Sequence, residues 1–106
     1  HSPPALRDAF VRSIHRVLRS GGRFILRDHD VNSVEMNHMV ALAHDVFNAG
    51  LGANWAVNQQ EIRNFTSMEG LVKYLDGFGF RVAAKKGPVV QAGDPTRNAL
   101  VEFVKA

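Results

Sequence analysis

Residues 17–30, VLRSGGRFILRDHD, decide the fold of this chain. A helical pattern ends there at Gly21 and Gly22, which is typical of a helix stop because glycine adopts the left-handed conformation without steric cost. Three consecutive apolar residues follow at positions 24–26, and such a run is typical of a strand covered on both faces. Polar residues come next, at the carboxyl end of the strand, where open α/β sheets bind ligands. The stretch therefore predicts one half of a crossover unit, with a candidate site at its tip.

The composition indicates one compact domain. The chain has 106 residues, of which 45% are hydrophobic, and a formal net charge of +3. This length is near the usual size of a single domain. The absence of cysteine excludes disulfides and thiolate metal ligands. No stretch is typical of a signal peptide or long enough to cross a bilayer, so we expect a cytoplasmic protein without a membrane partner.

Apolar residues at helical spacing predict about three helices, of which the first two precede position 49. The first helix begins after Ser2, whose hydroxyl can cap the free backbone N–H groups, and its apolar stripe runs over residues 6–18. The second helix spans residues 34–48. Asn32 or Ser33 is expected to cap it.

The third helix is predicted to start within residues 66–69, TSME. This is the capping-box pattern, in which the first hydroxyl and the fourth carboxylate each bind the backbone N–H of the other. The helix is expected to end at Gly77. Residues 49–65 are rich in glycine, asparagine and glutamine, and are expected to form a long irregular loop.

Three strands are expected, at residues 23–28, 81–92 and 98–105. Turn residues at positions 93–95 join the last two, so these strands should be antiparallel neighbours. The last strand is expected to lie at the centre of the sheet, because its near-continuous apolar sequence fits burial on both faces. The predicted fold class is α/β, in a single domain over residues 1–106.

The order of these elements resembles the C-terminal half of a class I S-adenosylmethionine-dependent methyltransferase. Residues 18–24, LRSGGRF, resemble the turn into the fifth strand of that family, with Ser20 in place of the common proline. Residues 75–80, LDGFGF, resemble the turn from a helix into its sixth strand. The resemblance implies a partial Rossmann-like methyltransferase sheet of three strands, with the last one central and antiparallel.

The resemblance also implies a function, the transfer of a methyl group to an acceptor. The family's glycine-rich loop, the acidic residue that holds the cofactor ribose and strands one to four have no counterpart in residues 1–106. S-adenosylmethionine is therefore expected to bind only the full-length protein, and this half alone is expected to be inactive. None of the family's cofactor-binding residues can be carried over to this sequence.

Asp28, His29 and Asp30 are the candidate catalytic residues, because they lie at the carboxyl end of the buried strand. A carboxylate beside an imidazole can hold one histidine tautomer and so prepare it as a general base. Adjacent strand residues point to opposite faces, so at most Asp28 and Asp30 share a side. The alternative is that all three residues only end a strand and cap a helix.

Trp55, Asn58 and Glu61 are the candidate substrate-binding residues, because the corresponding loop often contributes to the substrate lid in the resembled family. The alternative is that Trp55 only anchors a long loop to the core. A metal site is not expected. His38 and His44 are six residues apart, about 120 degrees around a helix, so they do not converge as residues four apart would.

The sequence suggests two kinds of partner, an RNA or acidic molecule and a second copy of the chain. Arginines near one side of the first helix support an alternative function, a non-catalytic module that binds RNA or an acidic partner, although such a stripe is more often a solvent-exposed face. In the resembled fold the strand at residues 24–26 pairs with a strand that this chain lacks. Exposed strand edges recruit partners, so a homo-oligomer is expected. The arginines are Arg12, Arg16, Arg19 and Arg23.

Overall fold

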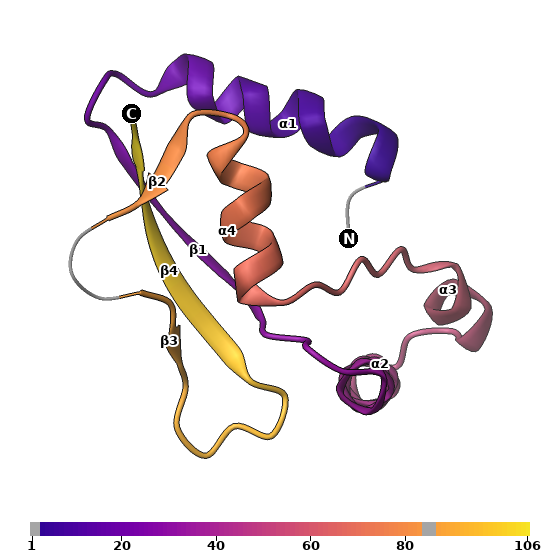
Figure 1. The fold of residues 1–106 in the computed structure, drawn as a ribbon. Helices are drawn as coiled ribbons and strands as arrows, with labels where there is room; N and C mark the ends of the chain where they lie inside the picture. Colours follow the sequence, from indigo (N-terminus) through magenta and orange to yellow (C-terminus); the bar gives the residue numbers. More distant parts are fainter. Residues whose placement is uncertain (1–2, 84–86) are drawn as a thin grey trace.

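A computed structural model describes residues 3–83 and 87–106. In these residues the protein is an α/β fold, with α1 and α4 against the sheet and α2 and α3 beyond the end of β1 (Figure 1). The helices are α1 (Pro4–Val17), α2 (Val34–Gly50), α3 (Trp55–Gln60) and α4 (Met68–Asp76). The strands are β1 (Arg23–His29), β2 (Phe80–Val82), β3 (Val89–Val90) and β4 (Asn98–Lys105).

The last strand is the centre of the sheet. β4 lies between β1 and β2 and is antiparallel to both, which confirms the predicted central position and direction. The strand expected over residues 81–92 is instead two short strands, because β2 and β3 pair with different parts of β4. Residues 84–86 of that range lie outside the described part of the chain.

The sheet is covered on one face, which corrects the expectation of two covered faces. Burial alternates along β1 and β4. Val101 and Phe103 are buried in the core that α1 and α4 help to form, whereas Ile25 and Leu100 on the other face are 70% and 51% exposed. The short apolar runs hide this alternation, but the charged residues Arg23, Arg27 and Glu102 all lie on the open face. The helices α1 and α4 therefore cover the face that carries only apolar side chains at positions 24, 26, 99, 101 and 103.

The main core forms where α1 and α4 meet the sheet. The ring of Phe24 lies 4.9 Å from that of Phe80 and 5.3 Å from that of Phe103, centroid to centroid. Full burial of a side chain of this size contributes about 1.5–3 kcal/mol. A second, smaller cluster holds α2 near the end of β1. It contains Val31, Met36 and Val40, with Phe65 packed against them.

The caps of the first two helices agree in part with the predictions. Ser33 is the N-cap of α2, and its Oγ accepts a hydrogen bond from the backbone N–H of Met36 at 3.1 Å. This confirms one of the two predicted caps. Pro3 is the N-cap of α1 and makes no side-chain hydrogen bond there. The predicted cap at Ser2 lies outside the described residues.

The capping box predicted for the third helix is wrong by one residue. The N-cap of α4 is Ser67 rather than Thr66, and Ser67 Oγ accepts from the backbone N–H of Gly70 at 3.0 Å. The position that a box would need for its carboxylate is therefore Gly70, and Glu69 is one residue too early. Threonine and serine are both favourable N-cap residues, so the sequence does not distinguish Thr66 from Ser67. The helix begins at Met68, which makes Ser67 the cap.

Residues 49–65 are not loop throughout, because they contain α3. Asn54 caps this short helix, with its Oδ1 accepting from the backbone N–H of Ala56 at 2.8 Å. The segment has no apolar stripe, so periodicity does not indicate a helix there. Its buried residue is polar, Asn58. Hydrogen bonds to α2, described below, take the place of apolar packing.

Candidate functional site

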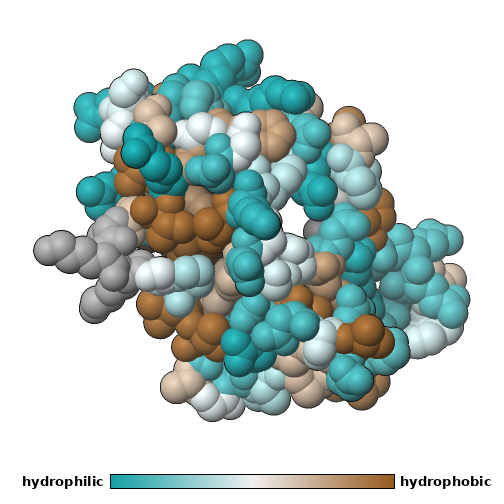
Figure 2. All heavy atoms as spheres, in the orientation of Figure 1, coloured by the Kyte–Doolittle hydropathy of each residue, from teal (hydrophilic) through white to brown (hydrophobic). Residues whose placement is uncertain are grey.

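The carboxyl end of β1 opens onto a groove of three adjoining hollows, of about 400, 360 and 430 Å³. The first hollow lies between His29, the turn before β4 and α2. The second shares His29 and His44 with the first, and the third shares Asp28 and Asn64 with the second. Figure 2 shows the opening of the third hollow between α4 and the segment that leads to it from α3. The end of β1 is therefore in the middle of the groove.

Asp28 and His29 point to opposite faces of the sheet, as the alternation of a strand predicts. Asp28 lies on the face that carries Leu26 and lines the third hollow. Its Oδ1 accepts from the backbone N–H of His29 at 2.8 Å. Both residues line the second hollow, but among the described residues the Asp28 carboxylate binds the backbone N–H of His29 and not its ring, so they do not form a carboxylate-imidazole pair.

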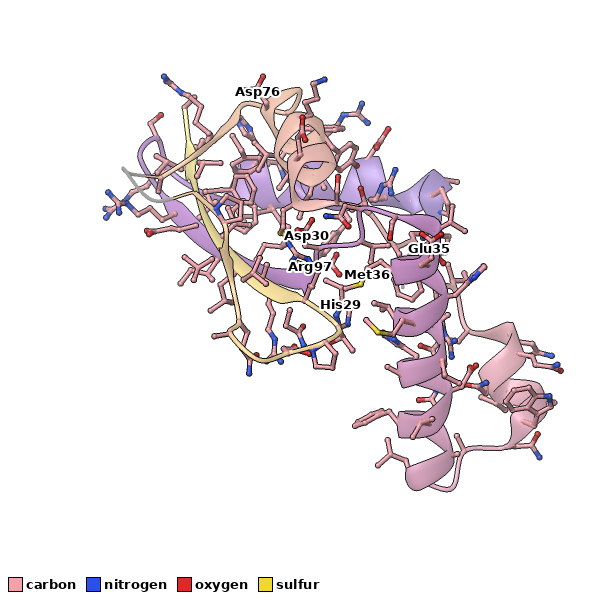
Figure 3. The ribbon with its side chains drawn as sticks, turned by 60° about the horizontal axis from the view of Figure 1, so that its bottom comes forward. His29, Asp30, Glu35, Met36, Asp76 and Arg97 are labelled. Carbon is pink, nitrogen blue, oxygen red and sulfur yellow. The ribbon has the colours of Figure 1, made fainter. Side chains whose placement is uncertain are left out.

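His29 stands between the sheet and α2 (Figure 3). Its Nδ1 lies 2.9 Å from the backbone carbonyl oxygen of Thr96, in the turn before β4. Its ring meets that of His44 edge-on, with 5.4 Å between centroids. His44 Nδ1 in turn lies 2.9 Å from the carbonyl oxygen of Val40, one helical turn earlier. Backbone carbonyls therefore orient both rings at the wall that the first two hollows share.

Asp30 joins three segments, and both of its oxygens are occupied. Oδ2 accepts from the guanidinium of Arg97 at 2.6 Å, and Oδ1 accepts from the backbone N–H of Met68 at 2.9 Å (Figure 3). The hydrogen bond from Arg97 is the main cause that lowers the pKa of Asp30, followed by the one from Met68. A carboxylate held ionised in this way is a weak base. Its geometry fits the alternative of capping and strand termination.

A buried polar network joins α3 to α2. Asn58 is 6% exposed, its Nδ2 donates to Asp45 at 2.8 Å, and its Oδ1 accepts from Asn48 at 2.7 Å and from Arg63 at 2.8 Å. Hydrogen bonds from Asn58 and then Arg63 lower the pKa of Asp45. Asn48 also donates to Glu61 at 2.6 Å and is the main cause of the lowered pKa of that carboxyl. Asn58 is therefore a centre of this network.

The structure brings two of the three candidate substrate-binding residues together, since Asn58 and Glu61 both accept hydrogen bonds from Asn48. Glu61 lines the first hollow with His29, whereas Asn58 lines none of the three hollows. Trp55 is 61% exposed at the start of α3, which lies beyond α2 from the sheet (Figure 3). The alternative role of Trp55, anchoring a loop to the core, is therefore wrong.

The third hollow contains a group of polar residues that the sequence did not single out. The guanidinium of Arg7 lies 4.7 Å from the ring centroid of Tyr74. The Tyr74 hydroxyl donates to Asp8 at 2.6 Å, and burial is the main cause that raises the pKa of Tyr74. Arg7 and Tyr74 line the hollow together with Asp28. The sequence carries no signal for this group, because Arg7 and Asp8 lie on α1 and their partner Tyr74 lies on α4, 66 positions after Asp8.

The arginines of the proposed basic stripe are divided by the fold. Arg12 lies 5.3 Å from the ring centroid of Phe78. Arg23 donates to Glu102 at 3.0 Å on the open face of the sheet, across from α1.

Within residues 3–83 and 87–106, no three His, Asp or Glu side chains lie close enough together to hold a metal ion.

No helix in the described part of the chain is long and apolar enough to cross a membrane. Comparisons with models of protein families, with curated proteins and with solved structures found no match.

Proposed function

We propose that the chain is the C-terminal half of a cytoplasmic S-adenosylmethionine-dependent methyltransferase, in which it forms the side of the site that holds the acceptor. The observation that carries the proposal is the strand order. The last strand, β4, lies between β1 and β2 and runs antiparallel to both. This is the arrangement that the resemblance implies, and it accompanies the two helix-to-strand turns on which the resemblance rests.

The described residues do not fit a site for the cofactor. A glycine loop that holds an anionic or nucleotide group follows a strand and opens a helix. The described glycines with positive φ are placed otherwise: Gly21, Gly52 and Gly79 follow helices, and Gly93 lies between β3 and β4. The proposal therefore assigns the cofactor to a half of the domain outside this chain. No step of cofactor binding rests on residues of this chain.

The acceptor side of the site is supported by the groove at the end of β1. The first hollow combines the apolar side chains of Ala43 and Phe47 with the polar groups of His29 and Glu61. Binding pockets for small molecules typically have this mixture of apolar walls and a few oriented polar groups. Methyl transfer needs close approach of the reactants and, for weakly acidic acceptors, a general base. We assign His29 as that base, since it lines the first hollow, whereas Asp28 does not line it and both oxygens of Asp30 are occupied.

The test uses the product of the complete reading frame that encodes the chain. It should bind S-adenosylmethionine and transfer its labelled methyl group to an acceptor. His29→Ala is expected to lower turnover by about a hundredfold while cofactor binding stays the same. His38→Ala is the matched control, because His38 is exposed on α2 outside the three hollows. A full-length protein that fails to bind S-adenosylmethionine would contradict the proposal.

The alternative, an interaction module for RNA or an acidic partner, has weaker support. Arg16 and Arg19 remain exposed near the end of α1, but Arg12 and Arg23 make contacts on different faces. A continuous basic surface is what such a module needs. Salt-dependent RNA binding that is lost in the double variant Arg16→Glu, Arg19→Glu would favour the module over the enzyme.

A further inference from the structure

The turn before β4 is organised by one carboxylate. Asp94 Oδ1 accepts from the backbone N–H of Thr96 at 2.9 Å and from its hydroxyl at 2.7 Å. Asp94 Oδ2 accepts from the backbone N–H of Asn98 at 3.2 Å and from its side-chain amide at 2.8 Å. The hydrogen bonds from Thr96 are the main cause that lowers the pKa of Asp94. The side chain of Asp94 thus holds the turn in one conformation.

This turn lies directly on the end of β1. The carbonyl oxygen of Thr96 meets His29 Nδ1 at 2.9 Å, although the two residues are 67 positions apart. The carbonyl oxygen of Arg97 accepts from the backbone N–H of Asp30 at 2.9 Å, and the Arg97 side chain binds the Asp30 carboxylate. The turn is therefore fixed both internally, by Asp94, and against the strand that carries His29.

The partner of Nδ1 decides the tautomer of His29. A carbonyl oxygen can only accept a hydrogen bond, so at 2.9 Å the ring nitrogen Nδ1 must carry the proton and donate it. In the neutral ring the other nitrogen, Nε2, then carries the lone pair. The ring lines the first two hollows, and no hydrogen bond to Nε2 is found among the described residues.

We propose that Asp94 is a positioning residue that fixes His29 in the Nδ1-protonated tautomer, so that Nε2 accepts a hydrogen from a ligand bound in the groove. The ligand class follows from this geometry: it presents an O–H or N–H group to Nε2. If this ligand is the methyl acceptor, a step that rests on the proposed function, the acceptor is a hydroxyl or amine compound that still holds its proton when it binds.

The tautomer of the neutral ring can be measured on the chain itself, by long-range proton–nitrogen NMR of the histidine rings above the titration range. His29→Gln assigns the signals. We expect a protonated Nδ1 and an unprotonated Nε2 in the unmodified chain. A ring protonated on Nε2 would overturn the inference without any variant being made.

Two variants separate the role of the Asp94 carboxylate from that of the neighbouring hydroxyl. Asp94→Ala removes all four acceptor contacts, so His29 should move to the mixture of tautomers of a solvent-exposed histidine. Thr96→Val is the matched control, because it removes one hydroxyl and keeps the carbonyl that meets Nδ1. Asp94→Asn keeps one acceptor oxygen, so its population of the Nδ1-protonated tautomer should lie between those of the other two variants. It replaces Asp94→Ala in the test if the alanine variant is unfolded. A fully retained tautomer in folded Asp94→Ala would contradict the role of Asp94.

The ligand class is tested with two small probes, phenol and anisole, which differ in whether the oxygen carries hydrogen or methyl. Phenol should shift the Nε2 resonance of His29, and anisole at the same concentration should not. Equal shifts with both probes would overturn the O–H and N–H donor requirement. These measurements involve no methyl transfer, so their failure is distinct from a failure of the full-length protein to bind S-adenosylmethionine.

Discussion

At the scale of single residues, Asp30 illustrates how a polar side chain after a strand can serve the fold rather than the chemistry. Its two oxygens bind Arg97 and the first backbone N–H of α4, at Met68. An anionic side chain at the start of a helix is favourable because the helix dipole is positive there. Asp30 therefore connects β1, α4 and the turn before β4 through one ionised carboxylate.

Replacing Asp30 with asparagine is expected to lower the free energy of unfolding by about 1 kcal/mol at pH 7, a modest value because solvent screens the partly exposed Arg97. Folding lowers the pKa of Asp30 below its ordinary value of 3.8. The stabilisation is therefore present above that value and is lost as the pH falls through the folded pKa. Urea denaturation at pH 7 and pH 3 checks this, with Asp76→Asn at the exposed end of α4 as control. A difference between the Asp30 variant and the parent that stays constant with pH would contradict it.

At the scale of elements, α3 shows a short helix held by hydrogen bonds. Asn58 binds Asp45 and Asn48 on α2, together with Arg63 just after α3. A buried polar group is stable only when it is hydrogen-bonded, so each of these partners depends on the others. Trp55 on the same helix is exposed and takes no part in the network.

Asn58→Ala is accordingly expected to lower the free energy of unfolding by about 1–3 kcal/mol, because it leaves buried donors and acceptors unpaired. Trp55→Ala should change it by less than about 0.5 kcal/mol, as for most surface substitutions. Urea denaturation of the two variants checks both values. If Trp55→Ala proved as destabilising as Asn58→Ala, the exposed position of Trp55 would be wrong.

At the scale of the whole molecule, β1 pairs with β4 on one side and with no other described strand. An unpaired edge invites association, so we expect a dimer that buries on the order of 1,000 Å² or more in total. Arg23 and Arg27 flank the exposed Ile25, and Ile25→Lys would add a third positive charge to this edge. Light scattering should show a dimer that this variant dissociates. A monomer mass at high micromolar concentration of the unmodified chain would contradict the expectation.

The isolated chain is also expected to have no useful affinity for S-adenosylmethionine. The described glycines with positive φ do not form a cofactor loop, and the proposal assigns the cofactor to the other half of the domain. Calorimetric titration of the chain should give no measurable heat at micromolar concentrations. Micromolar binding would place a cofactor site within these 106 residues. It would contradict the proposal that the cofactor binds the other half of the domain.

The sequence by itself determined the elements whose signals are local. The glycine pair at positions 21–22, the Ser33 cap and the apolar spacing placed α1, β1, α2 and α4 close to their observed bounds. The turn residues at positions 93–95 correctly predicted that β3 and β4 are antiparallel neighbours. These features depend on backbone conformations and side-chain spacing within a few residues, which is why they can be predicted from a single chain.

Only the tertiary structure decided that α3 forms and how the polar residues at the end of β1 are used. Asp28, His29 and Asp30 are neighbours in sequence, yet they meet a hollow, the Thr96 carbonyl and the Arg97 guanidinium respectively. The last two contacts each join residues 67 positions apart. Local propensities do not specify such contacts, because they depend on how the turn before β4 is brought back against the end of β1.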